Sequence, residues 1–131
     1  MTARVVGIGG IFFKARDHDR LRAWYREHLG LAVSDWGGVV FDPMPASPAG
    51  RAGTTVWSIF PGDTTYFEPG TSPFMINYRV DDLDQVLAAL RAEGCAVDER
   101  VDSSEFGRFG WVVDPEGNRV ELWEPPRVPR P

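Results

Sequence analysis

The chain has 131 residues, of which 43% are hydrophobic and 25% are charged, and these values predict one globular domain over residues 1–131. Its net charge of -5 and its scattered basic residues, with Lys14 as the only lysine, argue against a nucleic-acid partner. Cys95 is the only cysteine, which excludes an intrachain disulfide and a metal site built from several cysteines. The longest apolar run, at 5–13, is short and interrupted by glycines, so we expect a cytoplasmic protein with no membrane partner.

The first half of the chain predicts a strand, a helix and two further strands. Residues 8–15 have the pattern of a strand, and Asp17 is placed to cap a helix that ends at Gly30. Residues 37–43 and 54–60 are predicted as strands, with a loop of small residues and prolines between them. The apolar stripe of the helix consists of Leu21, Trp24, Tyr25, His28 and Leu29.

The second half repeats this order of elements. A strand is predicted at 74–80, and Asp81 or Asp82 then caps a helix that ends at Gly94. Short strand candidates follow this helix, as they follow the first one. The repetition indicates an internal duplication of one structural unit.

Two such units define the expected fold. One strand–helix–strands unit cannot cover both faces of its own sheet, so two copies are expected to pair. We therefore predict an α+β fold in which two βαβββ modules, at about 5–68 and 73–124, pair curved mixed sheets around a central cleft.

A predicted hairpin near the end of the chain is its most distinctive feature. Residues 114–118 contain Asp, Pro, Gly and Asn, which suit a tight turn between two strands. On the second strand Glu121 and Trp123 share the face opposite to that of Val120 and Leu122, because side chains alternate. A carboxylate is therefore expected to face the cleft.

The same alternation predicts which side chains line the cleft. Large apolar walls with a few polar groups are typical of small-molecule pockets. If Lys14 and Arg79 point inward, their positive charges favour an anionic ligand. The expected ligand-binding residues are Phe12, Lys14, Trp57, Met75, Asn77, Arg79 and Trp123, together with Glu121.

Three roles are open to Glu121 at this point. A buried carboxylate without a partner is costly, so Glu121 is expected to form an ion pair with Arg79 or Lys14, to bind a metal, or to face a substrate as a catalytic acid or base. Burial would raise its pKa for the last of these roles.

Three stretches of the sequence resemble the vicinal oxygen chelate superfamily, which includes glyoxalases, bleomycin-resistance proteins and extradiol dioxygenases. They are the helix end at 23–31 after Asp17, the strand-to-helix junction at 78–84 and the closing segment at 114–122. The resemblance covers nearly the whole chain. It implies the duplicated fold predicted above, a small-molecule ligand and a homodimer.

The resemblance also implies a divalent metal as cofactor, because enzymes of this superfamily bind one in the cleft through the first strand of each module and the closing strand. The matching positions here are Gly10, Met75 and Glu121. Glycine has no ligating side chain, and a thioether is a poor ligand for a hard divalent ion, whereas a catalytic metal normally takes three protein ligands.

The leading functional hypothesis is therefore a glyoxalase- or bleomycin-resistance-like protein that binds a small organic molecule, anionic if the basic side chains line the cleft, without a complete three-ligand metal site. The alternatives are a divalent-metal-dependent lyase or dioxygenase that uses Glu121 as a ligand, and metal-free acid–base catalysis by Glu121.

Overall fold

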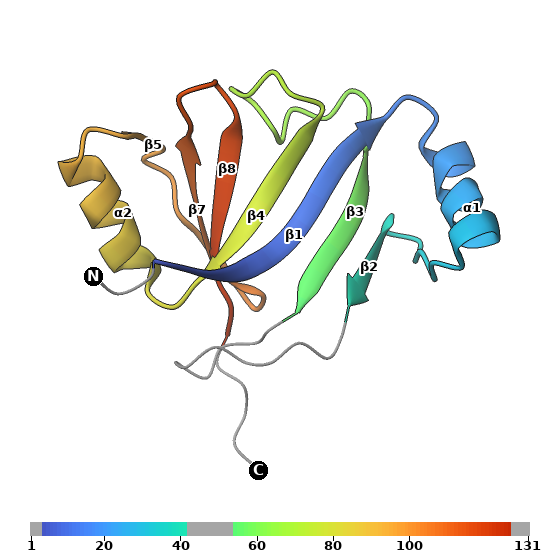
Figure 1. Ribbon diagram of the computed structural model, residues 1–131, viewed down its shortest axis with the longest axis horizontal. Helices are drawn as coiled ribbons and strands as arrows, with labels where there is room; N and C mark the ends of the chain where they lie inside the picture. Colours follow the sequence, from blue (N-terminus) through green and yellow to red (C-terminus); the bar gives the residue numbers. More distant parts are fainter. Residues whose placement is uncertain (1–3, 42–53, 127–131) are drawn as a thin grey trace, which may run out of the picture.

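Within residues 4–41 and 54–126, which the computed structural model describes, the chain forms two helices and one eight-stranded mixed sheet (Figure 1). In chain order the elements are β1 (Val5–Ala15), α1 (His18–Leu29), β2 (Gly38–Phe41), β3 (Thr55–Pro61), β4 (Phe74–Val80), α2 (Leu83–Ala92), β5 (Ala96–Val97), β6 (Asp102–Ser104), β7 (Gly107–Val113) and β8 (Arg119–Glu124). The strand order is β2-β3-β1-β4-β8-β7-β5, with β6 beside β7. The predicted α+β class is confirmed.

The two halves of the chain contribute equivalent pairs of strands to this sheet. In each half the first strand pairs in parallel with a later one, β1 with β3 and β4 with β8. An antiparallel strand lies outside each pair, β2 beside β3 and β7 beside β8. The halves meet where β1 and β4 pair antiparallel, which places Phe12 opposite Met75 at the centre of one continuous sheet.

Side-chain caps begin both helices as their sequences predict. The Asp17 carboxylate accepts a hydrogen bond from the Arg20 amide at 3.1 Å, and Asp82, rather than Asp81, does the same for Gln85 at 3.1 Å. Gly30 ends α1 in the left-handed conformation with φ of 67°, which glycine adopts without strain. The predicted loop at 44–53 and the last residues of the predicted strand at 37–43 lie outside the described residues.

The helices lie toward the two ends of the sheet in Figure 1 and bury very different amounts of apolar surface. From α2, Leu83, Val86 and Leu87 are buried in one core cluster with Val80 and Leu122 of the sheet. In α1 no residue is buried, and the expected stripe is largely open to solvent. Neither helix of the described residues has the length and apolar character needed to cross a membrane.

A second core cluster lies on the other face of the sheet and forms the base of the site described below. Phe12 and Met75 come from the two central strands, and Trp111 comes from β7. Phe67, from the connection between β3 and β4, completes the cluster and is buried. The centre of the sheet is thus filled by large side chains on the face away from the helices.

Candidate functional site

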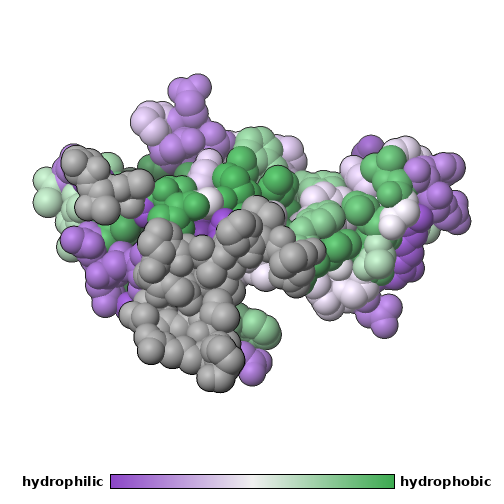
Figure 2. Space-filling model, turned by 60° about the horizontal axis from the view of Figure 1, so that its bottom comes forward, coloured by the Kyte–Doolittle hydropathy of each residue, from purple (hydrophilic) through white to green (hydrophobic). Residues whose placement is uncertain are grey.

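A cavity of about 420 Å³ opens on this second face, above the cluster. This volume lies within the range of roughly 300–1,000 Å³ that is typical of small-molecule pockets. Its walls are mostly aromatic and aliphatic. Figure 2 shows apolar surface over the middle of the molecule, outside the part drawn in grey, and hydrophilic residues mainly at its ends and along its upper edge. The described lining residues are Gly9, Phe12, Val40, Thr54, Val56, Phe60, Tyr66, Asn77, Phe106, Phe109, Glu121 and Trp123.

Glu121 is the polar centre of this cavity. Its side chain is 1% exposed, and its two carboxylate oxygens accept hydrogen bonds from three neighbouring side chains. Asn77 donates through Nδ2 to Oε1 at 2.6 Å, Trp111 donates through Nε1 to Oε2 at 2.9 Å, and the Tyr66 hydroxyl donates to Oε2 at 2.5 Å. The donors come from β4, β7 and the β3–β4 connection, so three separate segments hold one carboxylate.

Burial controls the acid–base properties of this group. It raises the pKa of the Glu121 carboxyl, while the hydrogen bonds from Tyr66, Asn77 and Trp111 oppose the rise by stabilising the charged form. Burial, together with the nearby charge of Glu121, also raises the pKa of the Tyr66 hydroxyl. Tyr66 therefore keeps its proton at neutral pH and acts as a donor.

Arg119 contacts Trp111 and Tyr66, two of the residues that donate hydrogen bonds to Glu121. It is 9% exposed, and its guanidinium carbon lies 4.5 Å from the centre of the Trp111 ring. Its Nη1 donates a hydrogen bond to the backbone oxygen of Tyr66, and its Nη2 lies 3.6 Å from the Asp98 carboxylate. Arg119 thus anchors two of the groups that donate to Glu121 without lining the cavity itself.

Four of the residues expected to line the cleft do line this cavity: Phe12, Asn77, Glu121 and Trp123. Asn77 and Glu121 are partners in the parallel register of β4 and β8, which explains why their side chains meet. Trp123 donates through Nε1 to the backbone oxygen of Phe106 at 2.7 Å, so it also fixes the tip of the β6–β7 hairpin at the cavity wall.

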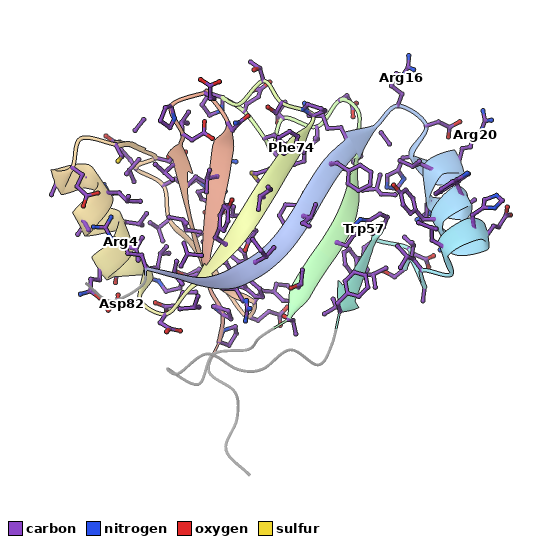
Figure 3. The ribbon with its side chains drawn as sticks, viewed as in Figure 1. Arg4, Arg16, Arg20, Trp57, Phe74 and Asp82 are labelled. Carbon is purple, nitrogen blue, oxygen red and sulfur yellow. The ribbon has the colours of Figure 1, made fainter. Side chains whose placement is uncertain are left out.

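The prediction for Trp57 is wrong. Its ring packs against Tyr25 of α1 and Phe13, with ring centres 4.8 and 5.3 Å away, and Figure 3 places it between β3 and α1. The register of β3 causes the difference, because Trp57 pairs with Ile11 on the helix-covered face. Its neighbours in the alternation, Val56 and Phe60, line the cavity instead.

Neither of the two basic residues expected in the cleft is among the described lining residues of this cavity. The Lys14 ammonium sits 5.6 Å from the centre of the Phe67 ring. The Arg79 guanidinium lies against the backbone of Gly7, so closely that a side chain at Gly7 would overlap it. Met75 is on the expected face but is buried in the cluster beneath the cavity. The hydrogen bonds on Glu121 thus come from uncharged donors rather than from Lys14 or Arg79.

Sequence patterns did not reveal several lining residues. Phe109 was recoverable in principle, because it alternates with Trp111 along β7 and pairs with Trp123, on which it stacks with ring centres 6.1 Å apart. No sequence pattern indicated Tyr66, because it lies in an irregular connection where side chains do not alternate between two faces. Its ring stacks on Phe60 with centres 5.7 Å apart, which directs its hydroxyl to Glu121.

The donor set does not fit a three-ligand divalent metal site. Among the described residues no group of three or more His, Cys, Asp or Glu side chains is placed to hold a metal ion. A bulge in β1 between Ile8 and Gly10 brings Gly9, rather than Gly10 alone, to the position facing Asn77 and Trp123. Neither glycine offers a ligand, so Glu121 alone cannot supply the three protein ligands that such a site normally takes.

Comparisons with known proteins agree on the fold. Among solved structures, the chain is similar to methylmalonyl-CoA epimerase from Mycobacterium tuberculosis, with 19% identity, a TM-score of 0.62 and coverage of 96% of this chain and 92% of that one. It is similar to a glyoxalase/bleomycin resistance protein/dioxygenase superfamily member from Vibrio splendidus 12B01, with 15% identity, a TM-score of 0.55 and coverage of 92% and 97%. The 2,3-dioxygenase LapB from Pseudomonas sp. KL28 has 21% identity and a TM-score of 0.61, with coverage of 95% of this chain and 42% of that one.

A match between the sequence and a family model assigns the chain to a family. No curated protein matches it significantly. The model of the glyoxalase-like domain, however, matches residues 10–123, which span both halves of the sheet and every described lining residue of the cavity except Gly9. The chain therefore belongs to the glyoxalase-like domain family, within the vicinal oxygen chelate superfamily that its helix ends and closing hairpin resemble.

Proposed function

We propose that this protein binds a small, largely apolar organic molecule in the cavity around Glu121, and that binding needs no divalent metal. The observation that carries the proposal is the buried Glu121 carboxylate, held by three uncharged donors at the base of a cavity of about 420 Å³ with aromatic walls. Rings such as Phe12, Phe60 and Trp123 supply apolar contact area. Glu121 and Asn77 supply the polar contacts that orient the ligand.

Isothermal titration with 2-naphthylmethanol, an apolar probe with one hydroxyl group, tests this proposal in buffer that contains a chelator. Two neighbouring residues of β2 provide matched variants. Val40 lines the cavity, whereas Val39 pairs with Trp57 on the opposite face of the sheet. We expect saturable binding to wild-type protein, strong weakening in Val40→Trp and little change in Val39→Trp, with circular dichroism to confirm folding of both variants.

Two outcomes would contradict the proposal. One is equal binding to the two variants, which would place the probe outside the cavity. The other is a stoichiometric divalent ion in protein purified without chelator, lost in Glu121→Gln, because that ion would restore the alternative of a metal-dependent lyase or dioxygenase.

A second candidate function is proton transfer by Glu121 without a metal. The burial of Glu121 and the raised pKa of its carboxyl favour this role, because a general base works best with a pKa near the ambient pH. The probe 2-naphthylacetone carries exchangeable protons beside its carbonyl group, and NMR in deuterated water measures their exchange. Catalysis predicts faster exchange with wild-type protein than with Glu121→Gln, and equal rates would remove this role.

A further inference from the structure

The described lining of the cavity contains an acidic side chain but no basic one. Of the described lining residues, Glu121 is the only one with a carboxyl group, and none is Lys or Arg. A buried charge is costly unless an opposite charge or several hydrogen bonds compensate it. Arg119 is a nearby cation, but it is stacked behind Trp111 and is bonded to the Tyr66 backbone rather than to Glu121.

The hydrogen bonds fit the ionised form of this carboxylate. Asn77 Nδ2 and Trp111 Nε1 can only donate, and each bonds to a different oxygen of Glu121. Both oxygens therefore act as acceptors. These hydrogen bonds favour the ionised form of Glu121 against the burial that raises its pKa, and none of the described lining residues is a cation that pairs with it.

A second acceptor lies beside the carboxylate. The Oδ1 atom of Asn77 is buried, has no hydrogen-bond partner among the described residues, and points toward Gly9 on the cavity wall. Asn77 is 2% exposed, and its orientation is fixed because Nδ2 donates to Glu121. An unpaired buried acceptor is costly, and a ligand that donates a hydrogen bond would satisfy it.

The walls favour a cation over a neutral donor. Phe12, Phe60, Phe109 and Trp123 present aromatic rings to the cavity, and ring faces attract positive charge. An ammonium group has several donors, so one such group can bond to the carboxylate and to Asn77 Oδ1 together. A carboxylate ligand would face repulsion from Glu121 and find no described basic partner in the lining.

We propose that the ligand is an organic amine, whose ammonium group pairs with Glu121 and Asn77 Oδ1 while its apolar part fills the aromatic cavity. This inference rests on the proposed function of the cavity, and it replaces the anionic ligand that Lys14 and Arg79 suggested. It gives the Glu121 position a cationic partner of organic origin in place of a metal ion.

Three probes with the same ring system test this inference: 2-naphthylmethylammonium, 2-naphthylmethanol and 2-naphthoate. They are titrated calorimetrically into wild-type protein, Glu121→Gln and the control Glu116→Gln, in which an exposed turn carboxylate is neutralised. We expect wild-type protein and Glu116→Gln to bind the ammonium at least about tenfold more tightly than the alcohol, and the alcohol more tightly than the carboxylate, as charge-assisted hydrogen bonds imply. In Glu121→Gln the preference for the ammonium should disappear, while binding of the alcohol stays within about threefold.

The outcomes separate the two proposals. Equal binding of all three probes, or a preference for the ammonium that survives in Glu121→Gln, would overturn the amine inference and leave a cavity for neutral ligands. Absence of binding by every probe would overturn the proposed function as well. Should the variant fail to fold, the ranking of the probes on wild-type protein decides the question by itself.

Discussion

Asn77 and Glu121 lie on neighbouring parallel strands as direct partners in the register, and the Asn77 amide donates to the Glu121 carboxylate at 2.6 Å. This relationship joins β4, the first strand of the second half, to β8, the last strand of the chain among the described residues. It also fixes the orientation of the Asn77 amide, because Nδ2 donates to Glu121. The geometry of the whole site depends on this pair.

Replacing Glu121 with glutamine should make the stability of the protein less dependent on pH. Burial raises the pKa of the Glu121 carboxyl above its ordinary value of 4.5, while hydrogen bonds from Tyr66, Asn77 and Trp111 and the charge of Arg119 oppose the rise. The folded state therefore holds this proton more tightly than the unfolded state, and stability falls as pH rises from about 4.5 through the folded pKa. Thermal melting of both proteins at a series of pH values above 4.5 should show the melting temperature of the variant rising relative to that of wild type as the pH rises. A constant difference between their melting temperatures would contradict this account.

Tyr66→Phe should weaken the site while the fold is kept. The change removes one of three donors to Glu121, so the free energy of unfolding should fall by about 1 kcal/mol and affinity for the ammonium probe should drop several-fold. Tyr25→Phe is the matched control, because the Tyr25 ring packs against Trp57 on the opposite face. Urea denaturation and calorimetric titration measure the two effects. The role of the Tyr66 hydroxyl would be rejected if both variants behaved alike.

Gly9→Ala should disturb the base of the cavity. A Cβ atom at Gly9 would lie 2.7 Å from Cε3 of Trp123 and would overlap Asn77 Oδ1, so both side chains would have to move. Overpacking of this kind typically costs about 1–3 kcal/mol. At Gly62 a Cβ would approach its nearest neighbour, the Ala15 oxygen, at 3.2 Å, so Gly62→Ala serves as the milder control. Equal unfolding free energies for the two variants would contradict the close packing at Gly9.

Asp114→Ala should destabilise the closing hairpin at neutral pH but not in acid. The Asp114 carboxylate accepts hydrogen bonds from the backbone amides of Glu116 and Asn118, each at 2.9 Å, and these bonds lower its pKa. A carboxylate with a lowered folded pKa stabilises the protein above its unfolded value of about 3.9 and loses that effect as pH falls through the folded pKa. Melting curves at several pH values should show the wild-type advantage vanish in acid. Asp63→Ala, at an exposed position, is the control, and an equal loss in it would contradict the role of the turn.

The sequence predicted the elements of the fold because their local signals agree with the final structure. Asp17 and Asp82 cap the two helices, and the turn at 114–118 joins two strands, as their residue types indicate. Alternation also brought Asn77 and Glu121 to one face, since both lie in regular strands whose register carries no shift between them.

The errors arose where local patterns do not determine the register. In β3 both Val56 and Trp57 are large and apolar, so alternation alone could not decide which of them faces the cavity; pairing with β1 decides it. The bulge in β1 depends on pairing with β4, and it brings Gly9 close to Asn77, which pairs with Gly10. Tyr66 lies in an irregular connection, where its direction is set by tertiary contacts with Phe60 and Glu121.

The indole region of a proton–nitrogen NMR spectrum, recorded while 2-naphthylmethylammonium is added in the presence of a chelator, tests the central claim most directly. The five tryptophans of the chain report from different places. Trp123 lines the cavity and Trp111 donates to Glu121, whereas Trp57 packs against α1. Our account predicts saturable shifts of the Trp111 and Trp123 signals while the Trp57 signal stays in place. Shifts confined to other tryptophans, or no saturable shift at all, would contradict binding of an organic ligand at Glu121.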